Sequence, residues 1–190
     1  SDQVVRQIAL VSSAQFGKEE FLLILEEALQ DPLPFNRKEA LRLLINQYPE
    51  QSDVRLKTAA LDKSATVRNF ARYFVKASDP TFDFAQFYRD RLRENDPKSL
   101  PFAVAGLAET GQYNDFSIVE MFLKNSNDQI KKIALHSLVL LDKERSVPHL
   151  LEFLQSNSTS LRSQAKKGLL KCSRYVQSDE LWRIYSANKN

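Results

Sequence analysis

The 190-residue sequence predicts an all-α fold, a right-handed α-solenoid of helical hairpins that repeat about every 31 residues. The repeat is marked by alanines at steps of 31 or 32 residues, namely Ala9, Ala40, Ala71, Ala103, Ala134 and Ala165. Apolar residues flank these alanines at helical spacing, and no segment shows the alternation typical of a strand. Because one such hairpin cannot bury its apolar face alone, neighbouring hairpins are expected to stack.

The helices that carry the alanines are expected to make the close contacts between hairpins. Val67 and Val75, for example, share a helix face with Ala71 because each lies four residues from it. Three positions after the alanine, the last three hairpins carry small residues, which are Gly106, Ser137 and Gly168. Small residues at this position let two helix backbones approach closely.

A second helix is expected after each alanine helix, with its own recurring apolar positions. These are Leu22, Leu25, Ala28 and Leu29 in the first hairpin, Phe116, Val119, Phe122 and Leu123 in the fourth, and Val147, Leu150, Phe153 and Leu154 in the fifth. Several prolines fall between the expected helices, where a missing N–H does least harm; they are Pro32, Pro34, Pro80 and Pro97. Pro148 is expected in the first turn of its helix.

Two kinds of segment resemble the two helices of HEAT repeats. Segments 67–71, 130–134 and 161–165 resemble the second-helix motif, with Asp62 ahead of the first of them, and segment 147–154 resembles the first helix. The short period is similar to that of bacterial HEAT-like repeats of the phycobilin-lyase type. The resemblance covers nearly the whole chain and implies a fold rather than an activity.

The resemblance also implies that each alanine helix is the second of its pair and lines the concave side. The chain then opens on a second helix and closes on a first helix around Leu181 to Tyr185. We therefore expect residues 1–190 to be a single HEAT-like repeat domain that is a segment of a longer solenoid. The fourth alanine helix departs from the motif, with Leu100 at the cation position and Pro101 beside it, and an altered stacking angle is expected there.

The helix that carries Val4, Val5 and Ile8 lacks a neighbour on one side in this arrangement. Repeat arrays normally cap such an end with a polar face. We expect the apolar stripe of this helix either to form an end-to-end dimer or to be covered by further chain.

The sequence lacks the residue patterns of common catalytic and metal sites. His136 and His149 are the only histidines and lie on different expected helices, at the surface or half-buried. None of the His-Glu dipeptides of HEAT-repeat di-iron hydroxylases is present. Cys172 is the only cysteine and is expected to be a small buried residue. We therefore expect no enzyme activity, no metal and no cofactor.

The composition favours a cytoplasmic protein. No apolar run is long enough to span a membrane, and the sequence shows no basic-then-apolar leader. A chain with one cysteine has no intrachain disulfide, which favours a reducing compartment.

A cation recurs three residues before the alanine in five of the six helices, as Arg6, Arg37, Arg68, Lys131 and Arg162. Polar residues recur six positions before this site, as Asp31, Asp62, Glu94, Asn125 and Ser156. The first interpretation is a ladder in which each cation bonds a polar residue at a neighbouring turn. The alternative is a basic stripe that binds phosphates.

The binding residues are expected two positions before and after the alanines, where polar side chains recur on one helix side. This polar strip consists of Lys38, Arg42, Asn69, Tyr73, Lys132, His136, Ser163 and Lys167, and Lys171 extends it by one turn. Most of an aromatic cluster over residues 70–88 is expected to be core, with Tyr73 as its exposed member. His136 is expected to add positive charge below about pH 6.5.

The strip carries no acidic residue, and the chain from Asn127 onward is net positive. We therefore expect a non-catalytic scaffold that binds a protein or peptide, with acidic character, through its concave face. The alternative is a nucleic-acid-binding HEAT-like protein, similar to DNA glycosylases of this fold, with a basic concave groove. A chromophore-lyase-like enzyme is suggested by the repeat length alone.

Overall fold

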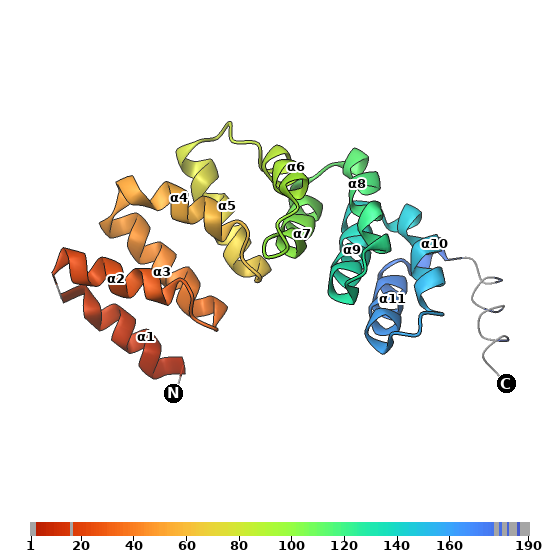
Figure 1. Ribbon diagram of the computed structural model, residues 1–190, viewed down its shortest axis with the longest axis horizontal. Helices are drawn as coiled ribbons and strands as arrows, with labels where there is room; N and C mark the ends of the chain where they lie inside the picture. The colour runs from red at the N-terminus through yellow and green to blue at the C-terminus, as the bar shows by residue number, and fades with distance from the viewer. Residues whose placement is uncertain (1–2, 16, 177–178, 180–181, 183–185, 187–190) are drawn as a thin grey trace. The chain divides into compact units, whose positions relative to one another are not determined.

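The computed structural model describes residues 3–15, 17–176, 179, 182 and 186. Across these residues the chain is helical and contains no strand, with eleven α-helices and four short 3₁₀ helices (Figure 1). The all-α prediction is therefore confirmed. The helices fall into two compact units, unit one (Ser1–Asp83) and unit two (Phe84–Asn190). The expected closing helix around Leu181 to Tyr185 lies outside the described residues, apart from Trp182.

Unit one contains five α-helices and one short 3₁₀ helix. They are α1 (Gln3–Ser12), η1 (Ser13–Gln15), α2 (Lys18–Ala28), α3 (Pro34–Gln47), α4 (Pro49–Ala59) and α5 (Ala65–Ser78). α2 packs on α3, α4 packs on α5, and α3 also contacts α5. A buried apolar cluster joins the first three helices; its members are Leu10, Phe21, Leu25, Ala40, Leu43 and Leu44.

Side chains in the turns of unit one fix where α3 and α5 begin. The Asp31 carboxylate accepts a hydrogen bond of 2.7 Å from the Leu33 N–H, and the Asp62 carboxylate accepts one of 2.7 Å from the Ser64 N–H. Such local bonds satisfy backbone groups ahead of a helix and favour a turn there. Pro34 then occupies the start of α3, where its missing N–H costs least.

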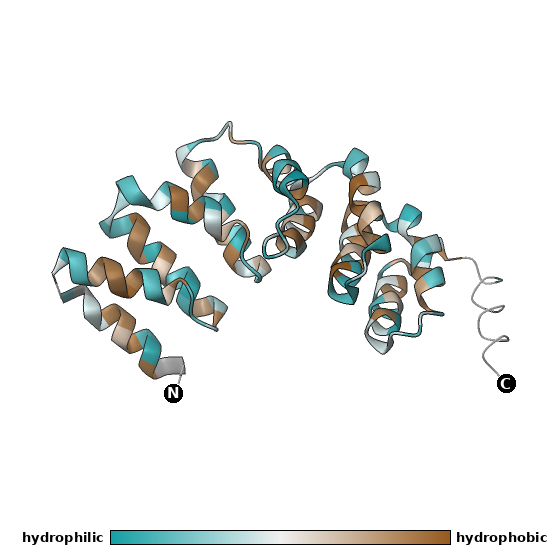
Figure 2. Ribbon diagram, in the orientation of Figure 1, coloured by the Kyte–Doolittle hydropathy of each residue, from teal (hydrophilic) through white to brown (hydrophobic). Residues whose placement is uncertain are grey.

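Unit two contains six α-helices with short 3₁₀ helices between and after them. They are α6 (Phe84–Glu94), α7 (Leu100–Thr110), η2 (Tyr113–Asp115), α8 (Phe116–Glu120), η3 (Met121–Lys124), α9 (Asp128–Leu141), α10 (Lys143–Phe153), α11 (Thr159–Lys171) and η4 (Ser173–Tyr175). α7 packs on α6 and α9, and α11 packs on α9 and α10. Figure 2 shows apolar and hydrophilic residues interspersed along the helices, as amphipathic helices require.

The alanine register is visible in the burial of the side chains. Five of the six marker alanines have no exposed surface, namely Ala40, Ala71, Ala103, Ala134 and Ala165. The sixth, Ala9, is exposed. The small residues three positions later also pack closely, because a Cβ added at Gly106 would lie 2.2 Å from Tyr88 Cε1. A Cβ added at Gly168 would likewise lie 2.5 Å from Leu150 Cδ2.

The cation ladder predicted from the sequence is present in unit one. Arg6 Nε lies 3.0 Å from Asp31 Oδ2, so α1 is tied to the turn before α3. Arg37 donates two hydrogen bonds to the Asp62 carboxylate, at 2.7 and 2.6 Å. In unit two the contacts are more local, since Arg162 donates to the Ser156 carbonyl at 2.6 Å.

Two local predictions fail in unit two. Pro148 lies inside α10 rather than in its first turn, because the Asp142 side chain accepts from the Arg145 N–H and the helix begins at Lys143. The expected helix over residues 116–123 is interrupted, since α8 ends at Glu120 and continues as a 3₁₀ turn. Its predicted apolar positions are nevertheless covered, with Phe122 half-buried and the others buried.

Arg89 and Asp115 form an ion pair that joins α6 to the turn before α8. Arg89 Nε and Nη2 lie 2.7 and 3.0 Å from the two carboxylate oxygens, and the Gln112 N–H donates to the same carboxylate at 2.8 Å. Asp115 is only 2% exposed. Burial raises the pKa of Asp115, but the hydrogen bonds from Arg89 and Gln112 outweigh it and leave the pKa below 3.8.

We expect Asp115→Asn to lower the free energy of unfolding by about 2 kcal/mol at pH 7, less than for a fully buried pair because Arg89 is 26% exposed. A depressed pKa in the folded state means that the ion pair contributes fully above about pH 4. Its contribution is lost as pH falls through the folded-state pKa. Urea unfolding of the parent chain and of Asp115→Asn would be measured between pH 7 and 2. The difference between their free energies of unfolding should become smaller below pH 4. A difference that stays constant over this range would contradict the assignment.

Candidate partner-binding site

Three residues of the polar strip line one groove between two helices of unit two. His136 comes from α9, and Lys167 and Lys171 come from α11. The groove has a volume of about 390 Å³, and its other lining residues are Val139, Gln164, Gly168 and Leu170. The structure therefore brings His136 together with two lysines that follow it by 31 and 35 residues in the sequence.

Helical spacing and close packing explain how this α9–α11 groove forms. Lys167 and Lys171 are four residues apart, so they share one face of α11. α11 packs directly on α9, and the central residues Ala134 and Ala165 are fully buried. Leu170 stays 78% exposed at the edge. The groove thus combines apolar surface with two ammonium groups, and no carboxylate is among its lining residues.

His136 contributes a neutral imidazole to the groove at pH 7. Partial burial lowers its pKa below 6.5, and the positive charge of Lys171 lowers it further. Glu109, on α7, acts in the opposite direction but does not cancel these effects. The onset of positive charge expected at about pH 6.5 is therefore shifted to lower pH.

The remaining strip residues of unit two flank the groove without lining it. Lys132 is half-buried on α9, and Ser163 is exposed on α11. Neither is among the residues that line the groove. The cationic part of the groove is therefore supplied by α11.

The strip residues of unit one are differently placed. Arg42, Asn69 and Tyr73 are exposed, as expected, whereas Lys38 is half-buried with its Nζ 5.6 Å from the centre of the Phe35 ring. Arg42 is bound by Glu39 through hydrogen bonds of 3.0 and 2.5 Å. This pairing offsets the positive charge of Arg42, so unit one has less net positive potential than the strip positions alone indicate.

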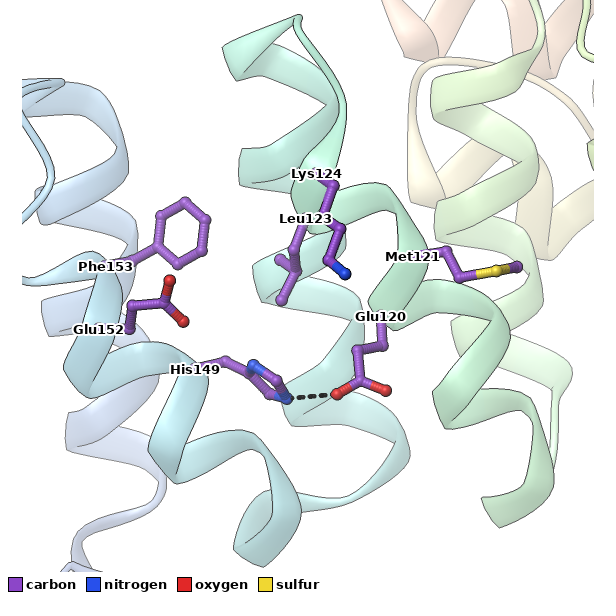
Figure 3. Close-up of a pocket in the computed structure, with 7 residues that line it drawn as sticks. All are labelled: Glu120, Met121, Leu123, Lys124, His149, Glu152 and Phe153. Atoms are coloured by element: carbon purple, nitrogen blue, oxygen red, sulfur yellow. Dashed lines mark ion pairs between the residues drawn. The ribbon is translucent and has the colours of Figure 1, made fainter.

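A second pocket lies between η3, the end of α8 and α10, and Figure 3 shows its seven lining residues. Its volume is about 720 Å³. His149 Nε2 lies 2.8 Å from Glu120 Oε1. Glu152 adds a negative charge to the lining and Lys124 adds a positive charge. The centre of the Phe116 ring lies 6.1 Å from the centre of the His149 imidazole.

This α8–α10 pocket was not predicted from the sequence. Glu120 and His149 are 29 residues apart and lie on two different helices, α8 and α10, so neither periodicity nor local spacing connects them. Both histidines are nevertheless at the surface or half-buried, as expected, and Cys172 is fully buried. Among the described residues, no group of three His, Cys, Asp or Glu side chains is arranged to hold a metal ion.

No family model matches the sequence, and no curated protein matches it either. Within the described ranges, the helices are too short or too polar to cross a bilayer.

Proposed function

We propose that this chain is a non-catalytic HEAT-like α-solenoid scaffold that binds an acidic segment of a protein or peptide in the α9–α11 groove. The observation that carries the proposal is the convergence of His136, Lys167 and Lys171 on one groove without a lining carboxylate. Opposite charge at such a surface speeds association and selects the partner.

The lining residues indicate what the bound segment contains. Lys167 and Lys171 provide ammonium donors for Asp or Glu side chains. Leu170, which is 78% exposed, provides apolar surface for a neighbouring aliphatic or aromatic side chain. A segment in which acidic and large apolar residues alternate at short spacing satisfies both features.

The repeated helix register supports the solenoid part of the proposal. Five of the six marker alanines are fully buried, two of them in unit one and three in unit two, and the turn contacts of Arg37 and Arg162 recur at equivalent positions. Contacts between each alanine helix and the next within a unit are those expected of stacked helical hairpins.

A charge-reversal experiment tests the proposed site. Peptides that bind the 190-residue chain would first be selected from a random library. Their affinities would then be measured for this chain and for the double variant Lys167→Glu/Lys171→Glu. We expect affinity to fall about tenfold or more, because two attractive contacts become repulsive. The matched control is Lys143→Glu/Lys166→Glu, which changes the net charge equally at exposed positions outside the groove. Equal losses in both variants would contradict the assignment of the site.

Salt dependence separates a peptide from a nucleic acid as the ligand. A few exposed ion pairs give a modest loss of peptide affinity with added salt. Phosphate neutralisation gives a steep loss, linear in the logarithm of salt concentration. Tighter binding of a DNA or RNA oligonucleotide than of any selected peptide, with such a steep slope, would overturn the peptide proposal.

A further inference from the structure

Among the residues that line the α9–α11 groove, only His136 can change its charge near neutral pH. The two lining lysines, Lys167 and Lys171, stay positive in this range. The side chain of His136 is exposed, so a ligand that enters the groove can contact the imidazole. The charge that the groove offers to a ligand therefore depends on the proton at His136.

Charged groups on three helices surround His136. On α11, Lys171 opposes its protonation, and Lys167 lines the same groove. On α7, Glu109 favours protonation. On α9 itself, Lys132 is half-buried one turn before His136. Among the described residues, no charged side chain of α8, η3 or α10 shifts the pKa of His136. Partial burial and Lys171 together outweigh Glu109, so the free chain holds this proton weakly.

An acidic segment in the groove reverses this balance. A carboxylate beside the imidazole favours its charged form. A carboxylate that pairs with Lys171 also offsets the repulsion that this lysine exerts on the imidazolium. In addition, the protonated ring has two N–H donors where the neutral ring has one, which adds a charge-assisted hydrogen bond to the ligand. The complex therefore has a higher His136 pKa than the free chain.

From this geometry we propose that an acidic segment binding in the α9–α11 groove takes up a proton at His136, so that the chain holds its partner more tightly as pH falls. This coupling rests on the proposed function, because it requires an acidic ligand in that groove. Since the complex has the higher pKa, acid favours the complex over the free chain. The gain in affinity begins as pH falls through the pKa in the complex. It is complete below the pKa in the free chain.

Isothermal titration calorimetry between pH 7.5 and 5.0 tests the coupling, with the tightest acidic peptide from the library selection as the probe. The Asp and Glu side chains of the peptide stay largely ionised over this range. We expect affinity to rise about three- to tenfold from pH 7.5 to 5.0, because a single imidazole gains a favourable charge. Measurements in two buffers of different ionisation enthalpy should show net proton uptake on binding.

The two histidines provide a matched pair of variants. His136→Gln has no charge at any pH of the series, so its affinity should stay constant and its binding should take up no proton. His149→Gln removes the chain's other histidine, which lines the α8–α10 pocket, and should keep the full pH dependence. Circular dichroism confirms that each variant is folded.

NMR gives an independent measurement on the unaltered chain. A pH titration of the His136 imidazole signals should give a higher pKa with saturating peptide than without it. An unchanged pKa, or a pH dependence that persists in His136→Gln, would overturn the coupling. The proposed site would still stand if Lys167→Glu/Lys171→Glu weakened peptide binding. If that lysine variant bound the peptide as tightly as the parent chain, the proposed function would fail, and the coupling with it.

Discussion

Replacing Asp62 with alanine is expected to lower the free energy of unfolding by about 3 kcal/mol. The Arg37 side chain is only 4% exposed, and its guanidinium donates to both Asp62 oxygens. Without the carboxylate, Arg37 keeps hydrogen bonds to the Asp31 and Pro32 carbonyls but leaves a buried positive charge without its counter-ion. Urea unfolding followed by circular dichroism measures the loss.

An exposed ion pair in the same unit provides the matched control. Asp53 pairs with Lys57 one helical turn away, and both side chains are well exposed. Asp53→Ala should therefore cost only a small fraction of the loss seen for Asp62→Ala. Similar losses in the two variants would show that the contact between α3 and the turn before α5 does not stabilise unit one.

Gly106→Leu is expected to cost about 3 kcal/mol, at the upper end for overpacked cores. A Cβ at this position would lie 2.2 Å from Tyr88 Cε1, and the Tyr88 side chain is fully buried, so it has no free space to enter. Leucine is a better helix former than glycine by roughly 0.8 kcal/mol, so helix propensity acts against the expected loss.

A double-mutant cycle with Tyr88→Ala separates overpacking from other effects. Tyr88→Ala alone leaves a cavity, and leucine at position 106 would fill part of it. The loss in the free energy of unfolding of the double variant should therefore be smaller than the sum of the two single losses by at least about 1 kcal/mol. Strict additivity would mean that α6 and α7 do not approach at Gly106 as described.

The helical fold could be predicted because it is encoded locally. An alanine with apolar neighbours four residues away defines a helix face without reference to the rest of the chain, and Ala71 and Ala165 are fully buried accordingly. Arg37 and Asp62 could be paired because the cation and the turn residue recur with the same period. The exposed Tyr73 follows from its position on the polar side of α5.

Other features depend on contacts between helices that the spacing of the sequence pattern does not specify. Arg89 reaches Asp115 across 26 residues, and His149 reaches Glu120 across 29, with no repeated pattern to indicate either pair. The change from α8 to a 3₁₀ turn at Met121 is not visible in the apolar spacing of segment 116–123, which matches that of segment 147–154. The pairing of Arg42 with Glu39 has a local origin, since the two residues are three positions apart on one helix.

The position of a bound peptide on the protein tests the central claim most directly. Amide chemical shifts of the isotope-labelled chain would be followed by NMR during titration with the tightest selected peptide. We expect the largest changes at His136, Val139, Gln164 and Gly168, with small changes at Glu120 and Glu152 in the α8–α10 pocket. Changes centred on the α8–α10 pocket, with the α9–α11 groove unaffected, would contradict the claim.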